Sequence, residues 1–552
     1  MLRGRRVVNH LALRPSRRPQ PSSSIHVASL SAMEVTRHNF TTALADVQAQ
    51  LALPSCKYAA IDTEFTGLTP HDKTKEKLID TLEERYNKVR QSGENFLITQ
   101  FGLALVHVDA DKTWLQCYNF YVFPRPYQNM DARFLCQASS IQFMSDHGFD
   151  FNKFIKDGIP YLTRRNEEYV RKSHARSVKN IGKAPPAKVN VSKPFDKEFL
   201  TETIAKIEAW LAADAEKELY IPSRNSFRRL LVFHAAKYGI KSSLADQIYT
   251  ESQGDGVLLV RADKNERENR LKRKIDQMNQ EVEDAVGFSK VIQLLADAKK
   301  PVIGHNCLLD FVYLYHQFCA PLPPTLTEFK AQLLTHFPVI YDTKHIALTC
   351  PAADSFESTS LSAVFEAMRD RLEPDVATFV GDSDPYRAAL LKSDEKSMPC
   401  HEAGFDALMT AVAYLGLASA GANGWQLAPL PLVSAPDALA PYMNRINLMA
   451  FEQGAFLDIA DPAQELNRDH VYVVTHASGL GTTKMEEVFP EASIARVFRE
   501  NDREVYVFLS EPLEALPPVK DEAMTITPFP IFKETPAVAP EEPAPSSWCT
   551  IS

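Results

Sequence analysis

The sequence predicts an α/β protein in which one mixed-sheet domain is interrupted by a small α/β domain and followed by an α+β domain. An apolar strand ends at Asp62, and two segments rich in aromatic and β-branched residues follow at 96–108 and 113–123. A similar strand resumes the pattern at 301–310, and short strands surround one helix at 469–512. With 45% hydrophobic residues among 552, the chain has enough apolar material for several cores.

The composition excludes several classes of protein. A net charge of −9 argues against non-specific coating of nucleic acid, so contacts with nucleic acid would depend on local basic patches. The eight cysteines include no Cys-x-x-Cys pair, which indicates neither a zinc site nor a disulfide framework. No run of about 18 apolar residues is present, so we expect no stable membrane insertion.

The first part of the interrupted domain is predicted to span 33–163. Residues 36–54 have the apolar spacing of a helix and lead into the strand before Asp62. The next two apolar segments are separated by the polar turn DADK and predict a β-hairpin. The sheet should therefore begin with three consecutive strands.

Residues 1–32 carry six arginines, six serines and no acidic residue, a composition typical of a mitochondrial transit peptide. Met33 offers an alternative start, which would make this segment a disordered extension. Both interpretations stay open. We expect a nuclear and cytoplasmic protein, or a mitochondrial one if 1–32 is a transit peptide.

The middle and the end of the chain divide by composition. Residues 164–194 hold nine Lys or Arg, two acids and a Pro pair, which predicts a basic linker. A small inserted domain should follow, and an amphipathic helix at 275–298 should lie near the start of the second part of the interrupted domain. The remaining predicted boundaries are 195–262 for the inserted domain, 263–426 for this second part, 427–515 for the α+β domain with its Pro-rich lead-in, and 516–552 for a flexible tail.

Four acidic residues predict a metal site. Asp62 and Glu64 lie two apart at a strand end, so both side chains project from one face. Asp310 closes the apolar segment IGHNCLLD, and Asp406 lies in an apolar helix five residues after His401. Each acid alone has an ordinary explanation, as a solvated strand end or a helix N-terminus. Together they match the preference of Mg²⁺ for carboxylate oxygens.

Such a site would suit in-line phosphodiester hydrolysis. One of two ions would activate the attacking water, and the other would stabilise the leaving 3′ oxygen. His401 would be the general base, because the ordinary pKa of histidine lies near neutral pH. The alternative for His401 is a local hydrogen bond at a helix end.

The order Asp-x-Glu, Asp, His-x4-Asp resembles the histidine-containing branch of the DEDD exonuclease superfamily. Within that branch, an ordered series of motifs covering roughly 33–512 is similar to the poly(A)-specific ribonuclease family. The motifs are EFTGL (64–68), ERYNKV (84–89), QFGLA (100–104), YNFYVFPRP (118–126), GFDFNK (148–153), GIPYL (158–162), DAVGFSKVI (284–292), IGHNCLLD (303–310), DTK (342–344) and HEAGFDA (401–407).

The resemblance implies a ribonuclease-H-like nuclease domain, an inserted R3H-like single-strand-binding domain and a C-terminal RRM-like domain. It also implies a homodimeric, Mg²⁺-dependent 3′→5′ exoribonuclease that shortens poly(A) tails and releases 5′-AMP. The implied metal ligands are Asp62, Glu64, Asp310 and Asp406, with His401 as the base. Phe65, Asn306 and Lys344 fall at positions that line the 3′-terminal nucleotide site, where a ring can stack a base and a lysine can meet a phosphate.

Two other functions are compatible with the same residues. The first is trimming of the 3′ ends of small non-coding RNAs. The second is an inactive RNA-binding adaptor, which the presence of all four carboxylates and the histidine disfavours.

The sequence departs from the family pattern in the accessory domains. An Arg-x3-His motif would fall on Arg229 and Phe233, with the histidine displaced to position 234, so single-strand binding would rest on Arg228, Arg229 and the basic linker. Leu480 stands where a cap-stacking tryptophan is expected, and leucine cannot stack a charged guanine. At the C-terminus, Cys549 begins a Cys-Thr-Ile-Ser prenylation box without a polybasic segment before it.

Overall fold

The computed structural model describes residues 33–529, apart from 110–111, 214, 374, 382–383, 391–398, 427–429, 432–436, 450, 452–454, 491 and 520. The possible transit peptide at 1–32 and the prenylation box at Cys549 lie outside the described residues. The expectations made for both segments stay predictions.

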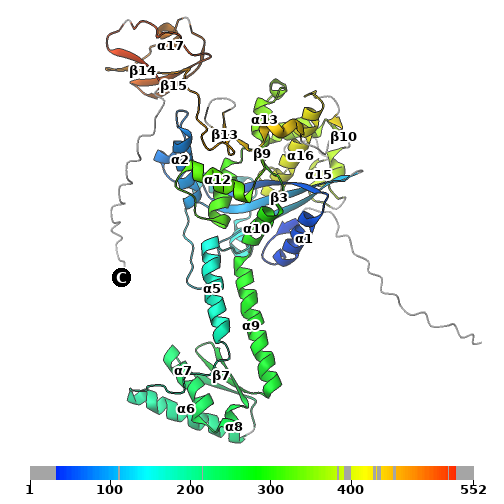
Figure 1. Ribbon diagram of the computed structural model, residues 1–552, viewed down its shortest axis with the longest axis vertical. Coiled ribbons are helices and arrows are strands. Elements are labelled where there is room, and N and C mark those ends of the chain that lie inside the picture. The colour runs from blue at the N-terminus through cyan, green and yellow to red at the C-terminus, as the bar shows by residue number, and fades with distance from the viewer. Residues whose placement is uncertain are drawn as a thin grey trace, which may run out of the picture.

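A six-stranded mixed sheet forms the centre of the molecule (Figure 1). Its strand order is β1-β4-β3-β2-β8-β9. The strands are β1 (Met33–Val35), β2 (Cys56–Phe65), β3 (Ile98–Val108), β4 (Thr113–Tyr121), β8 (Val302–Gly304) and β9 (Ile340–Asp342). Strands β2, β3 and β4 pair antiparallel in sequence order, which confirms the three predicted consecutive strands. The short strand β1, parallel to β4, was not predicted.

Helices cover both faces of this sheet. One apolar core joins the sheet to α1 (Phe40–Ala52), α10 (Ser289–Ala298) and α11 (Leu308–Leu314). The opposite core joins it to α14 (Leu361–Arg369) and α16 (Ala403–Ala422). Because both faces of the sheet are covered, β3 and β4 are buried along almost their whole length instead of alternating between buried and exposed residues.

Helix α16 is the one helix of the described chain that is long and apolar enough to cross a membrane. Its apolar window is wholly buried in the second core, so it acts as a core helix.

Residues 164–194 are not simply the linker that the sequence predicted. Helix α5 (Arg164–Asn180) runs beside α9 (Lys264–Val286) and forms a two-helix stalk (Figure 1). Arg171 donates to Glu283 over 2.7 Å, and the ring of His174 lies 2.7 Å from the side-chain oxygen of Asn279. Counting charges along 164–194 missed this helix because its one buried face is narrow and mostly polar.

The single helix expected at 275–298 is also two helices, α9 and α10. They separate at Gly287, which has a φ of +47°. A Cβ at Gly287 would lie 1.9 Å from the carbonyl oxygen of Pro160. The break therefore depends on the absence of a side chain.

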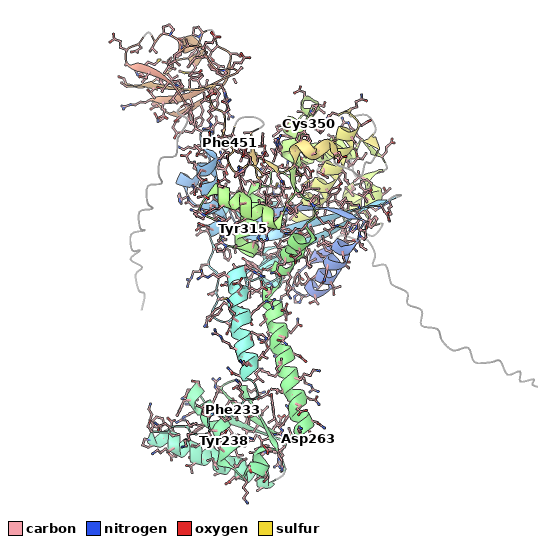
Figure 2. All side chains as sticks on the ribbon, viewed as in Figure 1. Phe233, Tyr238, Asp263, Tyr315, Cys350 and Phe451 are labelled. Carbon is pink, nitrogen blue, oxygen red and sulfur yellow. The ribbon has the colours of Figure 1, made fainter. Side chains whose placement is uncertain are left out.

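The stalk carries a small domain with its own apolar core. Its sheet has the order β5-β7-β6, and Figure 2 labels Phe233 in this domain and Asp263 where α9 begins. The elements are α6 (Pro194–Ala213), β5 (Glu218–Pro222), α7 (Ser226–His234), α8 (Ser242–Ala245), β6 (Ile248–Gln253) and β7 (Gly256–Arg261).

A four-stranded antiparallel sheet ends the described chain, in the order β15-β16-β14-β17. One of its faces packs around the short helix α17, and the other packs on Leu78 of the central domain. The elements are β14 (Val471–His476), α17 (Met485–Val488), β15 (Ile494–Asn501), β16 (Glu504–Leu509) and β17 (Met524–Pro528).

Further helices and strands complete the central domain. They are α2 (Leu82–Asn95), α3 (Ala138–Asp146), α4 (Phe151–Asp157), α12 (Leu326–His336), α13 (Thr343–Thr349), β10 (Leu372–Glu373), α15 (Arg387–Leu390), β11 (Leu430–Pro431), β12 (Arg445–Asn447) and β13 (Phe456–Asp458).

Candidate active site

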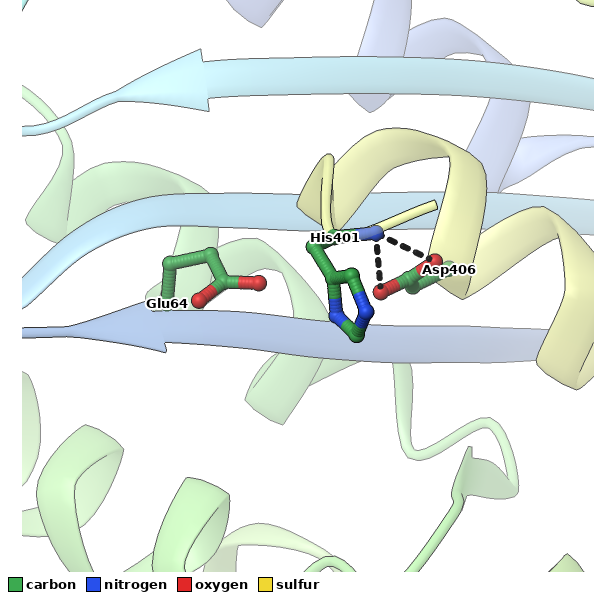
Figure 3. A group of neighbouring side chains, drawn as sticks. All are labelled: Glu64, His401 and Asp406. Carbon is green, nitrogen blue, oxygen red and sulfur yellow. Dashed lines mark hydrogen bonds between the residues drawn. The ribbon is translucent and has the colours of Figure 1, made fainter. Parts of the chain in front are cut away.

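The predicted acids meet at the end of β2. The cluster consists of Glu64 on β2, Asp406 in the first turn of α16, and His401, which precedes that helix. Each of the three places one ligand atom within 4.8 Å of those of the other two (Figure 3). Asp310 comes from the first turn of α11 and accepts a 2.5 Å hydrogen bond from Thr63, the β2 residue between Asp62 and Glu64. Three separate elements therefore converge on one strand end.

Burial raises the pKa values of all four carboxylates, and the charges of other acids in the site raise those of Asp62 and Glu64 further. Burial, together with the charges of Asp406 and Asp310, raises the pKa of Glu64 to about 8. Burial also raises the pKa of Asp406 to about 7, and that of Asp310 to about 7 against the lowering effect of the Thr63 hydrogen bond. The pKa of Asp62 is raised by burial and by its three acidic neighbours.

This donor set fits a divalent cation. Several buried oxygens of like charge are costly without a neutralising partner, and hard cations such as Mg²⁺ prefer oxygen ligands. The compact group consists of Glu64, His401 and Asp406, whereas Asp62 and Asp310 lie outside it and interact with its carboxylates through their charges. His401 lies close enough to be a ligand as well as a base.

His401 has a strained backbone with a φ of +67°. Its backbone N–H donates to both carboxylate oxygens of Asp406, over 3.3 and 3.1 Å (Figure 3). Burial and the neighbouring ring of His147 lower the pKa of His401, which favours the neutral imidazole that a base requires. The ring itself is exposed.

The sheet positions the start of α16 through contacts that the sequence did not reveal. The side-chain oxygen of Gln100 accepts from Ala403 N–H over 3.0 Å, and that of Asn119 accepts from Gly404 N–H over 3.3 Å. These bonds satisfy two donors that a helix start leaves free. Gly102 allows the close approach, because a Cβ there would lie 1.8 Å from the carbonyl oxygen of Ala403.

Two aromatic neighbours of His401 were also missed. The ring centroids of Phe143 and His147 lie 4.8 and 4.3 Å from that of His401. Phe143 is 43% exposed, so part of its ring is accessible to solvent beside His401. An exposed Phe in a polar helix was the only sequence signal, and it is too common to be specific.

The three residues expected at the 3′-terminal nucleotide lie in different surroundings. Phe65 packs on Tyr313 with ring centroids 4.3 Å apart. Asn306 has a φ of +60°, and its side-chain oxygen accepts from Asn447 over 2.8 Å. The amine of Lys344 donates to the carbonyl of Thr359 over 3.1 Å, and burial lowers its pKa.

Asp342 connects two of these residues and was not predicted. This fully buried carboxylate caps α13 and accepts the backbone N–H groups of Asn306, Lys344 and Asn447 over 2.8, 2.9 and 2.9 Å. A buried acid at the start of a helix, within the DTK motif, was the available signal. Beside Asn306 opens a cavity of about 370 Å³.

Arg228, Phe233 and Leu480, the positions considered for accessory RNA contacts, are engaged in contacts within the protein. Arg228 pairs with Asp196 over 3.1 Å and stacks on Phe199. Phe233 packs against the core of the inserted domain. Leu480 is only 2% exposed and belongs to the core of the C-terminal domain, so it forms no stacking surface.

The fold and the site together define an α/β nuclease built on a mixed sheet. A model of the CAF1 family of ribonucleases matches residues 35–414, and the chain belongs to this family. Further residues of the chain are matched by individual relatives.

Individual relatives match most of the chain. The chain is 31% identical to "Poly(A)-specific ribonuclease PARN" of Homo sapiens over 503 residues, which cover 87% of this chain and 76% of the relative. It is 32% identical to the protein of the same name from Danio rerio, over 87% of this chain and 74% of the relative. It is 30% identical to "Poly(A)-specific ribonuclease PNLDC1" of Homo sapiens, over 71% and 75%.

A solved structure of S. pombe Pop2p, described as an Mg²⁺- and Mn²⁺-bound form, is a more distant likeness. It has 15% identity and a TM-score of 0.33 over 69% of this chain and 90% of that chain. At this TM-score it supports no conclusion about the site.

Proposed function

We propose that this protein is a Mg²⁺-dependent exoribonuclease that shortens poly(A) tails from the 3′ end and releases 5′-AMP. The observation that carries the proposal is the convergence of Glu64, His401 and Asp406 beside Asp62 and Asp310. Relatives named poly(A)-specific ribonucleases support the substrate class.

The carboxylates would hold two divalent cations, which when bound supply a nucleophile at neutral pH and neutralise charge on the leaving oxygen. Asp62, Glu64, Asp310 and Asp406 would be the ligands. The exposed imidazole of His401 would take the proton of the attacking water, since its lowered pKa leaves it free to accept. Asp406 would keep His401 in place through its backbone N–H.

The 3′-terminal nucleotide would lie between Phe65, Asn306 and Lys344. The ring of Phe65 would stack on a base, and the amide of Asn306 would hydrogen-bond the base edge or the sugar. Lys344 would leave the Thr359 carbonyl to meet a phosphate.

We further propose that the C-terminal domain is RRM-like and that the protein is a homodimer. The strand order β15-β16-β14-β17 supports the first proposal, although only one helix accompanies the sheet within the described residues. The homodimer rests on the family resemblance, and light scattering of the purified protein tests it.

The substrate assay tests the proposal. The purified protein is given Mg²⁺ and RNAs that differ only in their 3′ tails, oligo(A), oligo(U) or mixed sequence. We expect oligo(A) to be degraded fastest, with 5′-AMP as product. Equal rates on all tails would instead favour trimming of small non-coding RNAs, and binding without turnover would favour the adaptor. Capped RNA should be degraded no faster than uncapped RNA, because Leu480 is buried.

A further inference from the structure

The outer face of α5 carries a stripe of four basic residues and one tyrosine. Arg165, Tyr169, Lys172, Arg176 and Lys179 follow one another at steps of four, three, four and three residues. At roughly 100° of rotation per residue, steps of this kind place all five on one face of a helix. All five are exposed, and Tyr169 is 64% exposed.

The stripe faces away from the rest of the stalk. Val170 and Glu167, on the opposite face of α5, are buried, and Arg171 and His174 bond to α9. Within the described chain, no ion pair involves the stripe cations Arg165, Lys172, Arg176 or Lys179. The neighbouring Arg164 and Arg171, in contrast, both pair with Glu167.

This arrangement differs from an ordinary solvated helix. The exposed positions of α9 mix Lys272 and Arg273 with Glu268 and Asp276, so that face has no single sign of charge. Exposed Glu168 lies at the edge of this face and pairs with Arg164, so the five positions of the stripe include no acid in a chain whose net charge is −9. A cationic line with an exposed aromatic ring is the chemistry that single-stranded nucleic acid recognises, through its phosphates and its base faces.

We propose that this stripe on α5 is a binding track for the phosphate backbone of single-stranded RNA upstream of the 3′ end. The inference rests on the proposed function only for the identity of the RNA as substrate. At 1.5 Å per residue the stripe is about 20 Å long, which suits a few nucleotides. Tyr169, between Arg165 and Lys172, offers its ring to one base.

A triple variant tests the track in the full-length protein. Lys172→Gln, Arg176→Gln and Lys179→Gln are combined in an Asp310→Ala background, so that RNA is bound but not consumed. Lys264→Gln, Lys272→Gln and Arg273→Gln on α9 form the matched control, with the same loss of two lysines and one arginine from exposed positions. Fluorescence anisotropy measures the Kd for long oligo(A) over a range of salt concentrations, and circular dichroism checks that the helices are intact.

We expect the α5 variant to bind long oligo(A) roughly tenfold more weakly, with a salt dependence of log Kd that is less steep by about 2, as for three lost single-strand phosphate contacts. Tyr169→Ala should weaken binding about fivefold or more, and Tyr169→Phe should not, because stacking needs the ring alone. The gain in affinity from short to long oligo(A) should shrink in the α5 variant and persist in the α9 control.

An unchanged salt slope, or an equal loss in the α9 control, would overturn the proposal. So would a loss of binding to vesicles containing phosphatidylserine without any loss of RNA binding, since the track would then serve a membrane surface. The binding assay needs no turnover. The α5 variant can therefore weaken RNA binding even if the protein does not degrade poly(A), and the protein can degrade poly(A) even if the α5 variant binds RNA normally. The two proposals are tested separately.

Discussion

At the residue scale, burial makes ionisation of the carboxylates at the end of β2 unfavourable. Burial raises the pKa of Glu64 to about 8 and those of Asp310 and Asp406 to about 7. Such groups stay protonated in the folded chain near neutral pH unless a cation compensates them. Acidity, metal affinity and stability are therefore linked at this site.

We predict that the metal-free protein loses stability as the pH rises from about 4, the ordinary carboxyl pKa, to about 8. Over this range the unfolded chain releases protons that the folded chain keeps, so the free energy of unfolding falls with pH. Mg²⁺ should restore more stability at the alkaline end, because its binding requires ionised carboxylates. Thermal melts in EDTA and in Mg²⁺ across this range measure both effects; a shift from Mg²⁺ that is independent of pH would contradict the account.

The Asp342→Asn variant should impair the positioning of Asn306 and Lys344 more than the chemical step at the carboxylates. The amide keeps one acceptor oxygen, so some of the N–H groups of Asn306, Lys344 and Asn447 lose their partner, at a cost of about 1–3 kcal/mol. We expect KM for oligo(A) to rise more than kcat falls, since Asp342 hydrogen-bonds neither to the carboxylates at β2 nor to His401, and it affects Asp310 only by raising its pKa through charge. Steady-state kinetics test this, and a fall confined to kcat would contradict the positioning role.

At the scale of elements, the meeting of β3 with α16 decides where His401 and Asp406 lie. Gly102→Ala would drive a methyl group into the carbonyl of Ala403. We expect a loss of about 1–3 kcal/mol of stability from overpacking, with a larger loss of activity than of RNA affinity. Denaturant unfolding and turnover measure the two effects. Full activity at unchanged stability would show that the helix start tolerates displacement.

Helices and strands with long apolar patterns could be predicted from the sequence. Those that are held in place by a few polar contacts could not. Strands β2 to β4 and the helix carrying Asp406 were predicted because their apolar runs are long. The helix α5 was missed because polar pairs such as Arg171 with Glu283 make much of its contact with α9. The acids of the site followed from motif order, whereas Asp342 acts on backbone groups from three separate segments, which only the folded chain brings together.

At the scale of the whole molecule, the C-terminal sheet is docked on the nuclease domain. Leu78 packs with Val471, Tyr506 and Phe508 on the face where an RRM-like sheet would stack bases. Arg468 fixes the contact by donating to the carbonyls of Leu78, Ile79 and Asp80, over 3.3, 2.6 and 2.7 Å. In this arrangement the aromatic face serves the interface between domains.

Arg468→Ala should release the C-terminal domain. The three carbonyls lose a buried charged donor, and hydrogen bonds of this kind contribute about 1.5–3 kcal/mol. We expect faster proteolytic cleavage before β14 and a larger radius in solution, with exposed Arg503→Ala as the unaffected control. Proteolysis and small-angle scattering that are identical for Arg468→Ala and the intact protein would contradict the docking.

We propose that the carboxylate cluster carries out the chemistry in one interrupted nuclease domain. Asp310→Ala tests it most directly, because Asp310 comes from α11 and meets β2 only in the folded chain. Turnover of oligo(A) with Mg²⁺ should be abolished, while anisotropy should show RNA binding within a few fold of the intact protein. Retained turnover by Asp310→Ala would contradict the assignment of the metal site.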